Sequence, residues 1–204
     1  MRKVFRSVCY LLILIVSVGL LGYSWLILQM EKAQKARQEG DIPRAASLYA
    51  RAEKPFYVVP GLPHVLRGDY KNVSLGQVSI LYEQNQSEDA FQKLEQISTT
   101  APFVIETGEY AFWTGNLLFR RALQTKDPET SVNSAKAALA EYQKGLAAEP
   151  GDWDLKYNFE LLSHIFLQKE RDQKKEQQKV KSILDKMRPT VEPSREDLAP
   201  EKRG

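Results

Sequence analysis

The sequence predicts an all-α protein in which an N-terminal transmembrane helix is followed by helical hairpins and a long final helix. Three observations lead to this fold class. An apolar run without any charge extends over residues 8–28. Small and aromatic residues recur at helical spacing in three later segments. No segment shows the alternation of apolar and polar residues that a half-buried strand requires.

The apolar run predicts an uncleaved signal anchor. As a helix it would rise about 31 Å, enough to cross a hydrocarbon core of about 30 Å. Three basic residues precede it, and Tyr23 and Trp25 lie near its far end, where interfacial aromatics are expected. A cleavable secretion signal is the alternative. Such a signal has a shorter apolar core and a small-x-small cleavage site, which residues 29–32 do not provide.

The flanking charges favour a cytoplasmic N-terminus over residues 1–7 and an exported body. Positive charge tends to stay on the cytoplasmic side, and the cluster before the run contains no acidic residue. Basic residues also follow the run within residues 32–37, but glutamates flank them. We therefore expect a single-pass protein of a bacterial inner membrane, bound to the lipid bilayer through residues 8–28, with its body in the periplasm.

Residues 29–168 are predicted to form the helical hairpins. The clearest segment has Ala138, Tyr142 and Gly145 at helical spacing, followed by Pro150 and a new apolar helix. Small residues let antiparallel helices approach closely, an aromatic ring fills the space between them, and a proline cannot extend the helix behind it. We therefore expect Ala138 and Gly145 to face a neighbouring helix at close range.

This spacing resembles the second helix of a tetratricopeptide-type repeat, and two looser copies precede it. They begin at Ala45 and Ala90, so the intervals up to Ala138 are 45 and 48 residues. A regular array would have a period of about 34 residues. The sequence therefore predicts degenerate tetratricopeptide-like hairpins with insertions, and an unrelated helical bundle is the alternative. Repeats of this kind imply protein binding rather than catalysis.

Caps and helix breakers place the individual elements. Ser87, Asp127 and Asp152 are expected to cap the helices that follow them. Three prolines within residues 55–63 should form an apolar loop, either a lid over the core or a docking site for a partner. The expected helices cover residues 31–38, 42–54, 71–84, 88–98, 106–124, 127–148 and 153 onward.

The final helix is predicted to close the array. Its first half should be broadly buried, because it has two apolar faces. One face contains Trp153, Tyr157, Leu161 and His164, and the other contains Phe159, Leu162 and Phe166. Over residues 169–188, eight basic and four acidic residues of mixed order indicate a solvated charged helix. Nucleic acid is not an expected partner, because aromatic residues are missing there. Residues 189–204, with three prolines, should be disordered.

The sequence contains no recognisable catalytic constellation, so we expect neither an enzyme nor a cofactor or metal. His64 and His164 lack a second histidine or carboxylate three or four residues on, as a metal site would need. The glycines form no phosphate-binding loop. The one cysteine, Cys9, lies in the apolar run, so it supplies no nucleophile and no disulfide for the body.

The predicted partner-binding residues lie on the helix that contains Gly115. In the tetratricopeptide register, this helix would direct Phe112, Asn116, Phe119 and Arg120 towards the concave groove. Asparagine and arginine one turn apart can bind a peptide backbone or a carboxylate. Carboxylate-binding repeats have a lysine where Phe112 stands, and the two phenylalanines could instead belong to the core.

A narrower resemblance covers residues 109–167. The segments WTGNLLFRRAL and EYQKGLAAEPGDWDLKYNFELL, together with the anchor and charged tail, are similar to small membrane-anchored repeat proteins of bacteria. These are encoded beside MoxR-type ATPases and von Willebrand A-domain proteins, and include the MxaK-type accessory proteins of methanol dehydrogenase clusters. The resemblance implies an assembly factor that helps such a periplasmic enzyme mature through protein contacts. A structural subunit of a stable bacterial envelope complex is the alternative.

Overall fold

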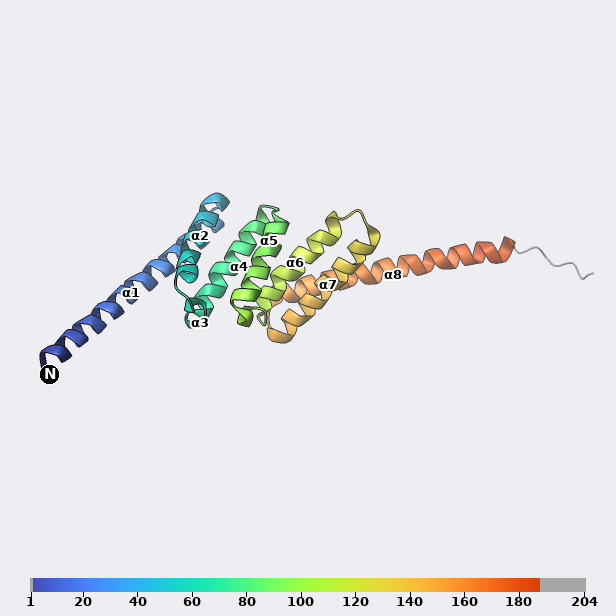
Figure 1. Cartoon of the computed structure of the whole chain (residues 1–204). Coiled ribbons are helices and arrows are strands. Elements are labelled where there is room, and N and C mark those ends of the chain that lie inside the picture. Colours follow the sequence, from blue (N-terminus) through green and yellow to red (C-terminus); the bar gives the residue numbers. More distant parts are fainter. Residues whose placement is uncertain (1, 188–204) are drawn as a thin grey trace, which may run out of the picture. The chain divides into compact units, whose positions relative to one another are not determined.

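The computed structural model describes residues 2–187, and this part of the chain is helical, without strands (Figure 1). The prediction of an all-α fold is therefore confirmed. The elements are α1 (Arg2–Gln38), α2 (Ile42–Val58), α3 (Leu62–Val65), α4 (Arg67–Glu83), α5 (Ser87–Thr100), the 3-10 helix η1 (Pro102–Val104), α6 (Gly108–Gln124), α7 (Pro128–Ala148) and α8 (Trp153–Met187).

The chain is divided into two compact units. The first ends at Glu160 and the second begins at Leu161. The first unit contains α1 to α7 and the start of α8. The predicted disordered tail, residues 189–204, lies outside the described residues.

Helix α1 is uninterrupted, but its two halves have different surroundings. The large apolar side chains from Tyr10 to Trp25 are exposed, whereas Leu26 and Ala36 are only 3% and 2% exposed. The segment Cys9–Gln38 is long and apolar enough to cross a membrane. The same helix therefore leaves its apolar N-terminal half uncovered and contributes its C-terminal half to the core of the body. The expected helix over residues 31–38 is the continuation of the apolar helix.

The hairpin of α1 and α2 depends on a short turn. Gly40 adopts φ +80°, a conformation that favours glycine, and the Asp41 side chain accepts a hydrogen bond from the amide of Arg44 at 3.1 Å. Helix α2 then returns along α1. The buried residues Leu48 and Tyr49 belong to the same apolar cluster as Ala33 and Ala36 of α1.

The prediction of a loop over residues 55–63 is wrong for most of these residues, because helices α2 and α3 include them. Helix α2 continues through Pro55 to its end, where the amide of Val59 donates to the Pro55 carbonyl at 3.0 Å. Helix α3 follows, and α4 begins before the expected residue 71. Proline removes one helical hydrogen bond, and the burial of Phe56, which is 3% exposed, stabilises the helix across this position.

Two of the three predicted caps are present. Asp127 and Asp152 each accept a hydrogen bond from the amide three residues further on, at 2.9 Å. The prediction for Ser87 is wrong, because Gln86 occupies the cap position and Ser87 is already helical.

Glycines allow three close helix contacts. A Cβ atom at Gly115 would lie less than 3.0 Å from the ring of Tyr142, and one at Gly76 would meet the ring of Tyr49 in the same way. Gly145 likewise faces α8 at close range, as predicted. Tyr142 packs against the helix before its own and Tyr49 against a helix after its own, so the two pairs are not equivalent positions of one repeat.

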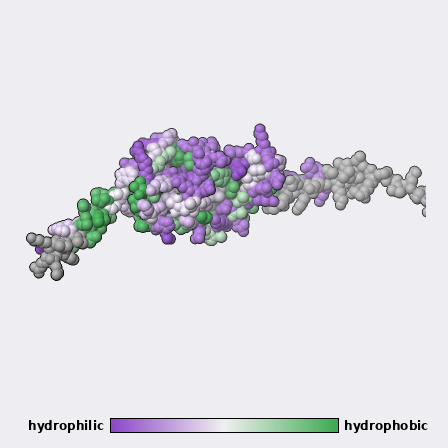
Figure 2. Space-filling view, in the orientation of Figure 1, coloured by the Kyte–Doolittle hydropathy of each residue, from purple (hydrophilic) through white to green (hydrophobic). Residues whose placement is uncertain are grey.

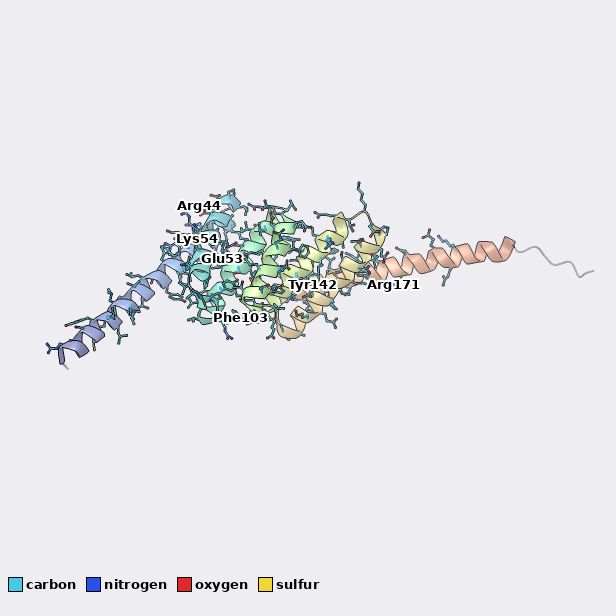
Figure 3. The ribbon with its side chains drawn as sticks, viewed as in Figure 1. Arg44, Glu53, Lys54, Phe103, Tyr142 and Arg171 are labelled. Carbon is cyan, nitrogen blue, oxygen red and sulfur yellow. The ribbon has the colours of Figure 1, made fainter. Side chains whose placement is uncertain are left out.

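A buried ion pair joins α2, α4 and α5. The ammonium group of Lys93 lies 2.5 and 2.6 Å from the two carboxylate oxygens of Glu53 and 2.9 Å from the Tyr57 hydroxyl. Ser74 and Gln77 of α4 donate to the same carboxylate at 3.2 and 2.7 Å. Figure 3 labels Glu53 within the body. A buried charge is tolerated when its oxygens are satisfied in this way, so these side chains stabilise one another.

The expected broad burial at the start of α8 is confirmed for the face of Phe159 and Leu162, which are partly and fully buried, and is wrong for the face of Trp153. Trp153 and Tyr157 are 72% and 58% exposed, while Leu155 is fully buried. Helix α8 therefore packs through the face of Leu155. The face of Trp153 and Tyr157 has no covering helix within the first unit.

Substituting Gly115 with alanine tests the close contact between α6 and α7. The new methyl group would collide with the Tyr142 ring, so Gly115→Ala should lower the free energy of unfolding by about 1–3 kcal/mol. Gly68 is a matched helical control with nothing within 4 Å of its ideal Cβ position. Gly68→Ala should raise stability by up to about 1 kcal/mol. Chemical denaturation in detergent measures both, and a stabilised Gly115→Ala variant would contradict the packing described.

Candidate protein-binding groove

A cavity of about 220 Å³ opens on one side of α1, α4 and α6, with Tyr49 of α2 also contributing to its wall. We call this cavity the groove. It combines amide, hydroxyl and charged side chains with one indole ring. Its lining residues are Gln34, Arg37, Tyr49, Asn72, Leu75, Gly76, Ser79, Glu109 and Trp113.

Two small residues of α4, Gly76 and Ser79, line the groove. Gly76 has no side chain, and the Tyr49 ring occupies the position where its Cβ atom would be. Ser79 is short, and its hydroxyl donates to the Gly76 carbonyl at 2.7 Å. Gly76 therefore lets the Tyr49 ring approach α4 closely enough to form part of the groove wall.

Two ion pairs connect the helices that line the groove. Arg37 of α1 bonds Glu83 of α4, with Nε and Nη2 at 2.8 and 2.5 Å from the same carboxylate oxygen. Lys71 of α4 lies 3.1 Å from the Glu109 carboxylate of α6. All four side chains are partly exposed, so each pair contributes about 1 kcal/mol or less to stability. Their larger effect is to place charges of both signs where a ligand could meet them.

A second, open hollow of about 500 Å³ adjoins the groove. It is lined by Gln34, Arg37, Gln38 and Glu83. Gln34 and Arg37 belong to both cavities.

Aromatic rings continue this surface along α6. Trp113, which lines the groove, lies 5.0 Å from the ring of Phe112 and 5.6 Å from that of Tyr82. The Arg120 guanidinium stacks 3.3 Å from the centre of the Tyr82 ring and donates to the Tyr82 carbonyl at 2.5 Å. This stacking attaches α6 to the end of α4.

The predicted binding residues are not gathered in the groove. Phe112 and Arg120 belong to the adjoining aromatic row. Asn116 faces α7 and α8, where its carbonyl oxygen accepts hydrogen bonds from the Tyr142 hydroxyl at 2.7 Å and from the Asn158 amide at 2.9 Å. Phe119 is partly buried and does not line the groove. Their role in partner binding stays a prediction.

Sequence reasoning missed Gln34, Asn72, Glu109 and Trp113 as members of one surface. They come from three helices, and a pattern on one helix cannot show which others lie beside it. The one usable signal was Gly76, a glycine inside an apolar helix, which often marks a close approach of two helices.

Among the described residues, no group of three His, Cys, Asp or Glu residues could hold a metal ion. The Glu53 carboxylate is fully engaged by its donors. Burial, followed by the nearby Glu53 charge, raises the pKa of Tyr57, so its hydroxyl stays protonated at neutral pH.

No family model matches the chain, and no curated protein or solved structure shows significant similarity to it.

The hydrogen bonds of Asn116 lead to a double-mutant prediction. Asn116→Ala removes the acceptor of the buried Tyr142 hydroxyl, which should lower the free energy of unfolding by about 1–3 kcal/mol. Tyr142→Phe removes the donor as well, so in the Asn116→Ala background it should cost clearly less than in the parent chain. Equal costs of Tyr142→Phe in both backgrounds, measured by denaturant titration, would show that this hydrogen bond is not formed.

Proposed function

We propose that this chain is a membrane-anchored adaptor or assembly factor that binds a peptide segment of a partner protein in the groove. The observation that carries the proposal is that α1 contains both the candidate membrane span and two residues of the groove. Its apolar N-terminal half is long enough to cross a membrane, and Gln34 and Arg37 near its C-terminal end line the groove. A partner bound there would be presented close to the membrane surface.

The chemistry of the groove suits a polypeptide ligand. Gln34 and Asn72 are exposed amides that can bond a peptide backbone in both directions. Trp113 offers an aromatic face for one side chain of the ligand. Arg37 and Glu109 can each exchange their intramolecular ion pair for a charge on the partner. The expected ligand is a segment with one apolar or aromatic anchor between polar residues.

The proposed location is a bacterial inner membrane with the body in the periplasm. The charges around the apolar run support this orientation. By the resemblance stated above, the partners are von Willebrand A-domain or MoxR-associated proteins. The process is then the maturation of a periplasmic enzyme such as methanol dehydrogenase.

A second candidate function is a structural subunit of a stable envelope complex. The exposed Trp153 and Tyr157 favour it, because a permanent neighbour would cover such an apolar face. Detergent extraction followed by size analysis distinguishes the two functions. A stoichiometric complex that survives washing indicates the subunit, whereas a monomer with transient partners indicates the adaptor.

Blocking the groove should abolish partner binding. A photo-crosslinking residue at Asn72 should capture a defined periplasmic partner, and the added substitution Gln34→Trp should remove that crosslink by filling the groove. Lys35→Trp is the matched control, because Lys35 is the next residue of the same helix, is exposed and does not line the groove. It should leave the crosslink unchanged. If both substitutions, or neither, remove the crosslink, the groove is not the binding site.

The proposed topology is testable independently of the groove. Alkaline phosphatase fused after Gly204 should be active in a bacterial host, because this enzyme folds only in an oxidising compartment. If instead only a fusion to a reporter that works in the cytoplasm is active, the body lies in the cytoplasm and the proposed orientation is wrong. A mature form that starts near Glu31 would show that the apolar run is cleaved.

A further inference from the structure

The junction between α2 and α3 carries exposed apolar side chains outside the α1 run. We call residues 57–65 the corner. Val58 and Val65 are 77% and 76% exposed, and Tyr57 and Val59 are about half exposed. Figure 2 shows apolar surface at the edge of the body beside the apolar part of α1. Such a cluster on a folded body indicates a contact that the isolated chain does not satisfy.

Hairpin geometry places the corner level with the end of the apolar run. Helices α1 and α2 lie antiparallel on either side of the Gly40 turn, and each rises about 1.5 Å per residue. The end of α2, Val58, therefore lies at the height of about residues 22–25 of α1. Phe56 belongs to the same core cluster as Leu26 and Met30, which agrees with this alignment.

The absence of a linker in α1 keeps the corner at that height. Protein covers α1 from Leu26 onward, and the side chains up to Trp25 are exposed. The helix has no break between these two parts. When α1 crosses a bilayer, the hydrocarbon boundary therefore lies next to Trp25. The adjoining surface of the body, which includes the corner, then meets the lipid headgroups.

Charge around the corner agrees with a lipid surface. Lys54 and Arg67 flank it, both are exposed, and residues 54–68 contain no acidic side chain. Arg67 is held in place, since its guanidinium lies 5.0 Å from the Phe103 ring centre and its Nε donates to the His64 carbonyl at 3.3 Å. Apolar residues beside fixed cations are the composition that binds the interface of anionic bilayers.

We propose that the corner is a second membrane contact of this protein. Val58, Val59 and Val65 enter the boundary between headgroups and acyl chains of the bilayer that α1 crosses, and Lys54 and Arg67 face the phosphates. This inference rests on the proposed anchoring by α1. It adds that the body is docked on the membrane, so that the groove has a fixed orientation relative to the bilayer.

The test is depth-dependent fluorescence quenching of the full chain. In a Cys9→Ser background, single cysteines at Val58, Val65, Leu21 and Leu123 carry an environment-sensitive dye. Each protein is reconstituted into vesicles of phosphatidylcholine and phosphatidylglycerol that contain lipids with a nitroxide near the acyl-chain carbonyl. Leu21 reports insertion of α1. Leu123 is the matched control, because it is 71% exposed and apolar but lies at the end of α6 remote from the corner.

Dyes at Val58 and Val65 should be quenched to an extent similar to Leu21, and the dye at Leu123 should show no quenching above background. Quenching at Leu21 alone would overturn the membrane contact while leaving the anchor intact. Absence of quenching at Leu21 would overturn the anchor and the contact together. If labelling Val58 or Val65 lowers the helical circular dichroism, Val59 is labelled instead, and the same quenching is expected there.

Introducing charge at the corner provides the second variant. Val58→Asp combined with Val65→Asp should abolish the quenching of a dye at Val59, because buried carboxylates are excluded from the acyl boundary. Quenching at Leu21 should not change. Val58→Thr combined with Val65→Thr, which keeps the side-chain shape without a charge, should retain most of the quenching. Unchanged quenching in the aspartate variant would refute the contact.

Discussion

The carboxylate of Glu53 holds the N-terminal half of the body together. It receives hydrogen bonds from α4 and α5 while it belongs to α2, so three helices share one buried negative charge. Removing Lys93 would leave that charge without its counterion, at a cost of about 3–5 kcal/mol. Tyr49 lies one turn before Glu53 on α2 and forms part of the groove wall. Helix α2 therefore contributes both to this buried ion pair and to the groove wall.

Local chemistry was predictable from the sequence, and contacts between distant segments were not. Asp127 and Asp152 cap their helices because a short acidic side chain bonds an amide three residues away whatever surrounds it. The prediction that Pro55 ends a helix was wrong, because the burial of its neighbour Phe56 outweighs the local preference of proline to end a helix. The cap predicted at Ser87 lies one residue earlier, at Gln86, and helix boundaries often differ from sequence expectations by one residue.

The candidate site shows the same division. The sequence correctly indicated that Gly145 faces another helix, since small residues at helical spacing predict close packing. It could not indicate that the oxygen of Asn116 is bonded by Tyr142 and Asn158, because those partners are 26 and 42 residues away. The groove escaped prediction for the same reason. It exists only where α1, α4 and α6 meet around Gly76.

Because α1 has no break, the thickness of a bilayer that it crosses would affect the orientation of the whole body. A helix whose apolar length exceeds the local hydrocarbon thickness tilts to bury its excess, and a shorter one draws the lipids inward. Because α1 is also a wall of the groove, any tilt would turn the groove with it, without a hinge to absorb the motion. If α1 anchors the protein and the groove binds a partner, as proposed, lipid composition would set the angle between the groove and the bilayer, with no ligand or covalent modification acting on the protein.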